Sequence, residues 1–149
     1  MIDLFGPGSR RVLGFIAQIL DLGPDDIDAV AGVWRRTPAE ARAAAWAAIQ
    51  RSMSPVGRSL IRNAAMVARE QAITAALTHG RYDWAFWAAA WDAAGALAAQ
   101  HRVNGESYRV LVAPMAVAFG WLSPEAAVPI PAQREVPFEL APLVTESTR

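Results

Sequence analysis

One acidic residue, Asp92, interrupts a long apolar stretch that runs from Trp84 to Gln100. A carboxylate that becomes buried has to be ion-paired, hydrogen-bonded or protonated, because desolvation disfavours its charge. We weigh three interpretations of Asp92: a solvent-exposed side chain on an alanine-rich arc, a structural ion pair with an arginine, and the acid or base of a pocket. The exposed side chain is the expectation that the alanine-rich surroundings favour.

Three tryptophans share one face of the same predicted helix, which we place at Asp83–Gln100. At about 100° per residue, Trp84, Trp87 and Trp91 lie within one narrow arc. A structural interpretation makes this the central helix of a bundle, with the three indoles as its packing mass. A functional interpretation makes them the wall of a ligand pocket or a dimer interface. In both cases each buried indole N–H needs an acceptor, so polar groups should meet the tryptophans.

Three arginines, Arg58, Arg62 and Arg69, line one stripe of a long helix predicted at Pro55–Thr78. Such a stripe is typical of a solvated face. It could instead form an anion site, because planar guanidinium groups bind carboxylates and phosphates through paired hydrogen bonds. Apolar residues separate these arginines, which favours an interface over a simple charge run.

The two histidines, His79 and His101, are both expected at helix ends. There they would interact with the last carbonyl groups of a helix. If the helix ends meet, they could line a pocket with Tyr82 and Tyr108, where a histidine could act as a general base. No partner residue in the sequence supports that role.

Several classes of chemistry are excluded by composition and by the absence of motifs. The chain has no cysteine and only two histidines, so cysteine-based zinc sites, thiol catalysis and a three-histidine site are excluded. It also lacks a metalloprotease helix motif, a serine nucleophile elbow, a phosphate loop and a dinucleotide fingerprint. We therefore expect no metal and no cofactor.

The charges balance overall, but they are unevenly distributed along the chain. The 14 basic residues, all arginine, match 14 acidic residues. Segment Arg35–Arg69 carries seven arginines and one acid, whereas Met1–Asp28 carries five acids and two arginines. This pattern favours pairing between helices or self-association, with an anionic partner as the alternative. Zero net charge and the lack of a helix-turn-helix signature weigh against nucleic-acid binding.

The arginine-only basic residues and the alanine excess are typical of a GC-rich, bacterial genome. The longest uncharged stretch, Val110–Pro124, has 15 residues and contains Pro114, so it is too short to span a membrane. The first residues lack the pattern of a signal peptide. We therefore expect a soluble, cytoplasmic protein without a membrane segment.

Capping residues and prolines mark the expected helix boundaries. Thr37 and Glu40 form a predicted capping box, Ser54 and Asp83 are predicted caps, and His79-Gly80 is a predicted helix end. The predicted helices are Ser9–Leu22, a second from Pro24, Ala41–Arg51, Pro55–Thr78, Asp83–Gln100 and Glu106–Leu122, the last kinked or broken at Pro114.

The predicted fold is an all-α, single-domain helical bundle of about five to six helices over residues 1–127. Residues 128–149 are rich in proline and are predicted to form an extended or disordered tail.

Two functions remain open from the sequence. The first is a small interaction protein that forms a homo-oligomer or binds a protein partner as an accessory subunit. The alternative is a cofactor-free enzyme or a binding protein for a small apolar molecule. In one version of this alternative the molecule also carries a negative charge. In that alternative Trp84, Trp87 and Trp91 form the pocket wall, Asp92 or His101 handles protons, and an arginine holds the negative group.

Overall fold

The computed structural model describes residues 9–99 and 104–123, and these residues form an all-α fold, as predicted. The predicted tail 128–149 and His101 lie outside the described residues. The elements are α1 (Ser9–Ile19), α2 (Pro24–Arg36), α3 (Ala39–Ser52), α4 (Pro55–Thr78), α5 (Trp84–Ala98), α6 (Gly105–Ala116) and a short 3₁₀ helix, η2 (Gly120–Leu122).

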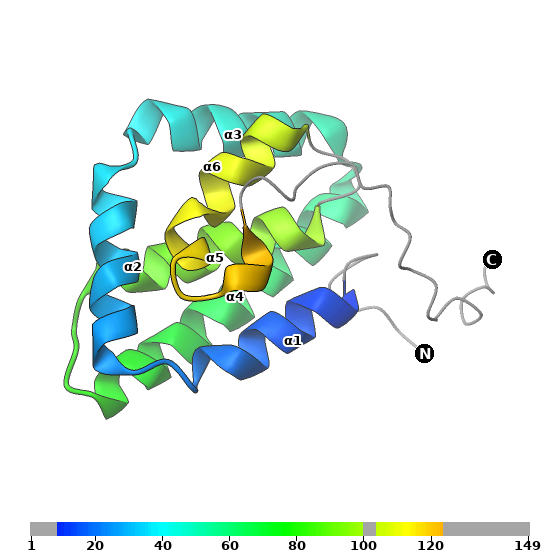
Figure 1. The fold of residues 1–149 in the computed structure, drawn as a ribbon. Coiled ribbons are helices and arrows are strands. Elements are labelled where there is room, and N and C mark those ends of the chain that lie inside the picture. Colours follow the sequence, from blue (N-terminus) through cyan, green and yellow to red (C-terminus); the bar gives the residue numbers. More distant parts are fainter. Residues whose placement is uncertain (1–8, 100–103, 124–149) are drawn as a thin grey trace.

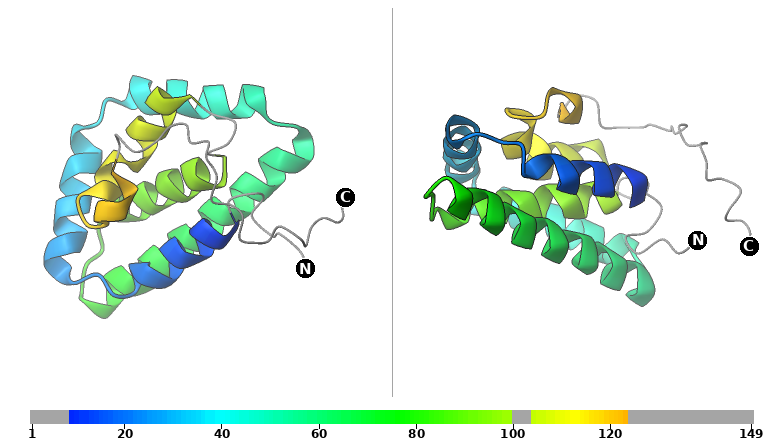
Figure 2. Two further views of the ribbon diagram at one scale, coloured as in Figure 1. Left: turned by 45° about the vertical axis from the view of Figure 1, so that its right-hand side comes forward. Right: turned by 90° about the horizontal axis from the view of Figure 1, so that it is seen from below.

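Helix α5 is the central helix of the bundle, as the sequence predicted. It packs against α4, α6, α2 and α1. Helices α2, α3 and α4 follow one another like three sides of a frame around it (Figure 1). Seen from below, α4 lies on one side of α5, and α1 and α6 lie on the other (Figure 2). Helix α5 therefore has neighbouring helices on several sides.

Small residues allow α4 and α5 to pack closely. One face of α4 consists mainly of alanines and is buried, including Ala64, Ala68 and Ala72. On α5 the alanine arc is also buried, with Ala85 and Ala89 fully inaccessible. The arc therefore faces the core rather than solvent, and its alanines favour the helix while leaving room for a neighbouring backbone.

Local signals placed most of the helix ends correctly. The Ser54 hydroxyl accepts a hydrogen bond from Gly57 N at 3.0 Å, and the Asp83 carboxylate accepts one from Ala85 N at 3.0 Å. Helix α4 ends at Thr78 with His79 as its C-cap, and Gly80 follows with φ of +71°, a left-handed conformation that glycine adopts without steric cost.

The predicted capping box at Thr37 is wrong. The Thr37 hydroxyl donates to Val33 O at 3.0 Å and its backbone N–H donates to Trp34 O, so Thr37 ends α2 instead of starting α3. Only Thr37 and Pro38 separate the two helices, and α3 begins at Ala39 with Pro38 in the cap position. Because the connection is so short, the Thr37 side chain forms its hydrogen bond with the end of the preceding helix.

The last predicted helix is shorter than expected. Helix α6 runs two residues beyond Pro114 and stops at Ala116, and η2 follows as a separate turn. A proline inside a helix removes one backbone hydrogen-bond donor and crowds the preceding turn, which weakens the helix around it. No helix in the described ranges combines the length and apolarity that crossing a membrane requires.

Candidate functional site around Asp92

Asp92 is buried, with only 4% of its surface exposed, so the expectation of an exposed side chain is wrong. The physical reason is the packing of its helix. The alanine-rich surroundings of Asp92, such as Ala89, Ala93 and Ala96, belong to the buried core of the bundle. As a buried carboxylate, Asp92 needs hydrogen-bond or charged partners nearby.

Two indole groups from two different helices hold the Asp92 carboxylate. Trp34 Nε1 on α2 donates to Asp92 Oδ2 at 3.0 Å, and Trp46 Nε1 on α3 donates to Oδ1 at 2.8 Å. One carboxylate on α5 therefore connects three helices. These bonds also satisfy the two indole N–H groups, which would otherwise be costly to bury.

Arg42 forms the third contact of this cluster, and it is a loose one. Its Nη1 lies 4.0 Å from Asp92 Oδ2, beyond hydrogen-bonding distance. The guanidinium carbon instead lies 4.0 Å from the centre of the Trp34 ring, in a cation–π arrangement. The predicted ion pair of Asp92 with an arginine is therefore present at the limit of contact, and the indoles are the closer partners.

The environment of Asp92 shifts the pKa of its carboxyl group. Burial raises the pKa of this carboxyl group above its ordinary value, and it outweighs the lowering by the bonds from Trp46 and Trp34 and by the charge of Arg42. The carboxyl group nevertheless has both oxygens engaged by indole donors. This geometry suits a structural acceptor better than a catalytic acid or base.

A glycine makes room for one of the two indoles. A Cβ atom at Gly95 would lie 2.2 Å from Cη2 of Trp46, far inside van der Waals contact. The Trp46 ring therefore packs directly against the backbone of α5, one turn away from Asp92. Gly95 is needed here because of this close approach and not because of an unusual backbone angle.

The three tryptophans of α5 do not supply the packing mass of the core, so that interpretation is wrong. Trp84 is 59% exposed, and Trp87 and Trp91 are half-buried. The Nε1 atom of Trp87 is buried, and no acceptor for it lies among the described residues. Trp84 packs against Trp34 with ring centres 4.9 Å apart, in a T-shaped contact.

The predicted arginine stripe of α4 does not act as one site. Arg58 donates to the backbone carbonyls of Gln50 and Met53, at 3.2 and 2.9 Å, and so caps the end of α3. Arg62 and Arg69 are exposed. Of the three guanidinium groups, these two remain available at the surface for an anionic partner.

The structure does not bring together Tyr82 and Tyr108, two residues of the suggested histidine–tyrosine pocket, and His101 of that pocket lies outside the described residues. Tyr82 precedes α5 and is exposed, whereas Tyr108 follows α5 and is buried. The 15-residue helix between them is about 22 Å long. Burial raises the pKa of Tyr108, opposed by Arg11, so its phenol is neutral at ordinary pH.

Sequence reasoning missed Arg42 and the joint role of Trp34 and Trp46. The N–H groups of these two tryptophans had no predicted partner. The signal was present in the requirement that each buried indole finds an acceptor, since Asp92 is the one carboxylate of α5. The pairing itself spans 58 and 46 positions, which no local pattern reveals.

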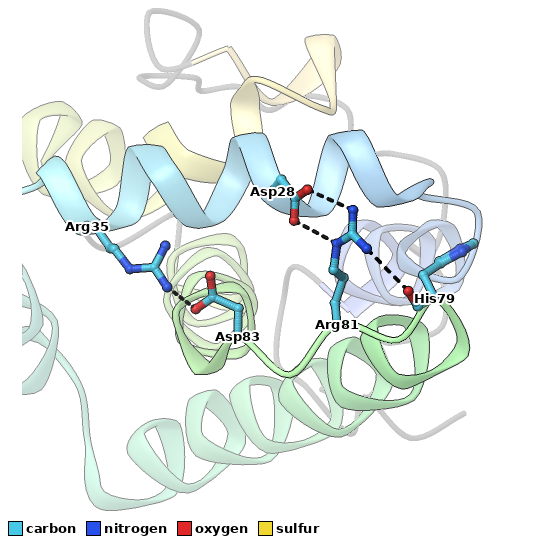
Figure 3. A network of polar contacts seen from close by, with 5 residues as sticks. All are labelled: Asp28, Arg35, His79, Arg81 and Asp83. Atoms are coloured by element: carbon cyan, nitrogen blue, oxygen red, sulfur yellow. Dashed lines mark hydrogen bonds and ion pairs between the residues drawn. The ribbon is translucent and has the colours of Figure 1, made fainter.

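A second polar cluster fixes the junction between α4 and α5 to α2 (Figure 3). Arg81 Nε and Nη2 contact the two carboxylate oxygens of Asp28, both at 2.9 Å, and Arg81 Nη1 donates to His79 O at 3.5 Å. Arg35 pairs with Asp83, the residue that caps α5. Hydrogen bonds from Arg81 lower the pKa of Asp28. Neither pair joins the acidic segment Met1–Asp28 to the basic segment Arg35–Arg69, because Arg81 and Asp83 lie outside both segments.

Large apolar side chains are exposed beside this junction. Leu77, Tyr82 and Trp84 lie within eight positions of one another, and Tyr82 is 73% exposed. We call these three residues the aromatic corner. Trp84 is held through its contact with Trp34, and the neighbouring residues Arg81 and Asp83 are held by ion pairs. The corner is therefore exposed but well anchored.

No group of three or more metal-ligating side chains occurs within residues 9–99 and 104–123. Comparison with known proteins finds no matching family model, no matching curated protein and no matching solved structure.

Proposed function

We propose that the chain is an interaction protein that associates with a second copy of itself through the aromatic corner. One observation carries the proposal: Tyr82 and Trp84 are 73% and 59% exposed on a junction that two ion pairs fasten to α2. Single exposed apolar residues are common, so exposure alone would not suffice. The combination of exposed aromatic side chains with a fixed backbone is what supports a binding surface.

The chemistry of the corner resembles that of interface centres. Tyrosine, tryptophan and arginine are enriched among the residues that carry binding energy, and here Arg35 lies beside the two aromatic residues through its pair with Asp83. An anchored surface also loses less conformational entropy when it binds. The ion pairs at the junction therefore favour binding, because they keep this surface ordered beforehand, more than they stabilise the fold.

The remaining surface charges support a second copy as the partner. Asp21, Asp25 and Asp26 are exposed around the start of α2, whereas Arg62 and Arg69 are exposed on α4. Opposite charges on separate surfaces of one molecule attract another copy of the same molecule. The sequence-based expectation of self-association thus acquires specific candidates, namely these exposed acidic and basic side chains.

Sedimentation equilibrium of the full chain over a wide range of concentrations tests the proposal. We expect the apparent mass to rise with concentration, and Trp84→Ser to weaken this rise. Val56→Ser is the matched control, because Val56 is also exposed but lies at the start of α4. A constant monomer mass, or equal association of the Trp84 and Val56 variants, would overturn the proposal.

A separate observation favours a second candidate function, the binding of a small apolar anion. The Nε atom of Arg42 is buried and has no hydrogen-bond acceptor among the described residues.

A further inference from the structure

We propose that the exposed indole of Trp121 binds a proline-rich segment of the same chain, residues 128–131. This inference goes beyond self-association, because it involves neither the aromatic corner nor the surface charges named above. It rests on three features: the contacts that hold Trp121, the composition of residues 128–131, and the short length of chain that connects the two.

Trp121 is an exposed aromatic side chain whose position is fixed. It belongs to η2 and is 42% exposed. Its Nε1 atom donates a hydrogen bond of 3.1 Å to Oε1 of Gln18 on α1. Its ring centre lies 6.2 Å from that of Phe119, which in turn makes a T-shaped contact with Phe15. Because these contacts already orient the indole, covering its exposed part costs little additional conformational entropy.

Residues 128–131 have the composition of a ligand for an aromatic surface. Single exposed apolar residues are common, so such a ligand is what makes Trp121 a candidate binding surface. The segment reads Val-Pro-Ile-Pro, and no charge occurs between Glu125 and Arg134. A proline has a fixed φ and restricts the residue before it to extended conformations, so the segment loses little entropy on binding. Prolines also bring no N–H group that an apolar ring would leave unpaired, and proline-rich segments commonly dock on aromatic side chains.

The short connection favours binding within one chain. Five residues, 123–127, separate Leu122 at the end of η2 from Val128. A peptide linker of this length spans about 12–14 Å on average, enough to turn back over the preceding indole. A linker that matches the span gives an effective concentration in the millimolar range, so a contact too weak to form between separate molecules forms within one chain. The later prolines, Pro137 and Pro142, are disfavoured because the effective concentration falls as the linker lengthens.

The indole signals of the full chain, labelled with ¹⁵N at tryptophan, test the contact. One double variant carries Pro129→Ser and Pro131→Ser, and the matched control carries Pro137→Ser and Pro142→Ser. We expect the indole N–H signal of Trp121, identified by its loss in Trp121→Phe, to shift in the first variant and to stay in place in the control. An unchanged signal in the first variant, or equal shifts in both, would overturn the proposal.

A spin label placed beside the segment gives a second, distance-based measurement. The chain has no cysteine, so Ala132→Cys provides a single attachment point for a nitroxide. We expect this label to broaden the indole N–H signal of Trp121. Closeness in sequence also broadens the signal, so the decisive comparison adds Pro129→Ser and Pro131→Ser to the labelled chain. The broadening should then fall, and equal broadening with and without the two prolines would contradict the contact.

A mixed sample separates binding within one chain from binding between two copies. It combines spin-labelled chain that carries no ¹⁵N with ¹⁵N-labelled chain that carries no spin label. We expect the Trp121 signal to stay sharp in this mixture, and broadening there would show that the segment reaches a second copy, against the proposal. Trp84→Ser, which should weaken self-association, should leave the broadening within one chain unchanged. Loss of the broadening in Trp84→Ser would likewise contradict binding within one chain, so the two proposals can fail separately.

Discussion

Trp46 and Asp92 lie 46 positions apart in the sequence, yet Trp46 Nε1 donates a hydrogen bond of 2.8 Å to Asp92 Oδ1. Trp34 donates to the other oxygen, so helices α2, α3 and α5 meet at one carboxylate. Buried polar groups that satisfy one another in this way hold helices in one arrangement, and removing one partner leaves the others unpaired.

Replacement of Asp92 should therefore destabilise the fold strongly. We expect Asp92→Ala to lower the free energy of unfolding by about 2–4 kcal/mol, because it orphans two buried indole N–H groups and leaves a small cavity. Urea denaturation measures the change. Asp21→Asn, at an exposed position, is the control and should stay within about 0.5 kcal/mol of the wild type. Similar values for the two variants would show that the cluster contributes little.

Gly95→Ala should destabilise the protein although alanine favours helices. Its Cβ atom would lie 2.2 Å from Cη2 of Trp46, so the ring has to move and its bond to Asp92 is disturbed. We expect a loss of about 1–3 kcal/mol. Gly14→Ala in α1 is the matched control: nothing lies within 4 Å of its Cβ position, so it should gain up to about 1 kcal/mol. A stabilising Gly95→Ala would contradict the observed packing.

The contribution of Asp92 to stability should fall as pH rises. Its pKa is raised in the folded state, so the folded protein binds more protons than the unfolded chain above the ordinary value of 3.8. The stabilisation is complete below that value and is lost as pH rises through the folded pKa. Urea denaturation of the wild type and Asp92→Asn at a series of pH values measures this difference.

Asp28 provides a control, because its contribution to stability should depend on pH in the opposite direction. Its pKa is lowered by Arg81, so its contribution is present above pH 3.8 and is lost as pH falls. The difference between wild type and Asp28→Asn should therefore grow as pH rises from acid, while the difference for Asp92→Asn shrinks. If both differences changed in the same direction, the assigned environment of Asp92 would be incorrect.

Breaking the ion pair between Arg81 and Asp28 should loosen the junction more than it destabilises the fold. Both side chains are partly exposed, so we expect Arg81→Ala to lower the free energy of unfolding only slightly, and less at high salt. Hydrogen exchange should accelerate at Tyr82 and Asp83, because the backbone there loses one of its anchors. Arg69→Ala is the control, and equal exchange in both variants would show that the pair does not anchor the junction.

Much of the fold could be predicted from the sequence, because the relevant signals are local. Caps such as Ser54 and Asp83 act on N–H groups two or three residues away, and Gly80 acts on its own backbone angle. The prediction for Thr37 was wrong because two adjacent helix ends compete for one side chain, and both outcomes satisfy the local pattern.

What the sequence by itself determined is therefore the set of helices, the central place of α5 and the special position of Asp92. Only the tertiary structure decided that Asp92 is buried, that Trp34 and Trp46 bind it, and that Trp84 faces solvent. The physical reason is that helical periodicity defines directions around one helix axis. The packing of all the helices together decides which neighbour lies in each direction. It also decides which indole N–H groups find a hydrogen-bond acceptor and which indoles stay exposed.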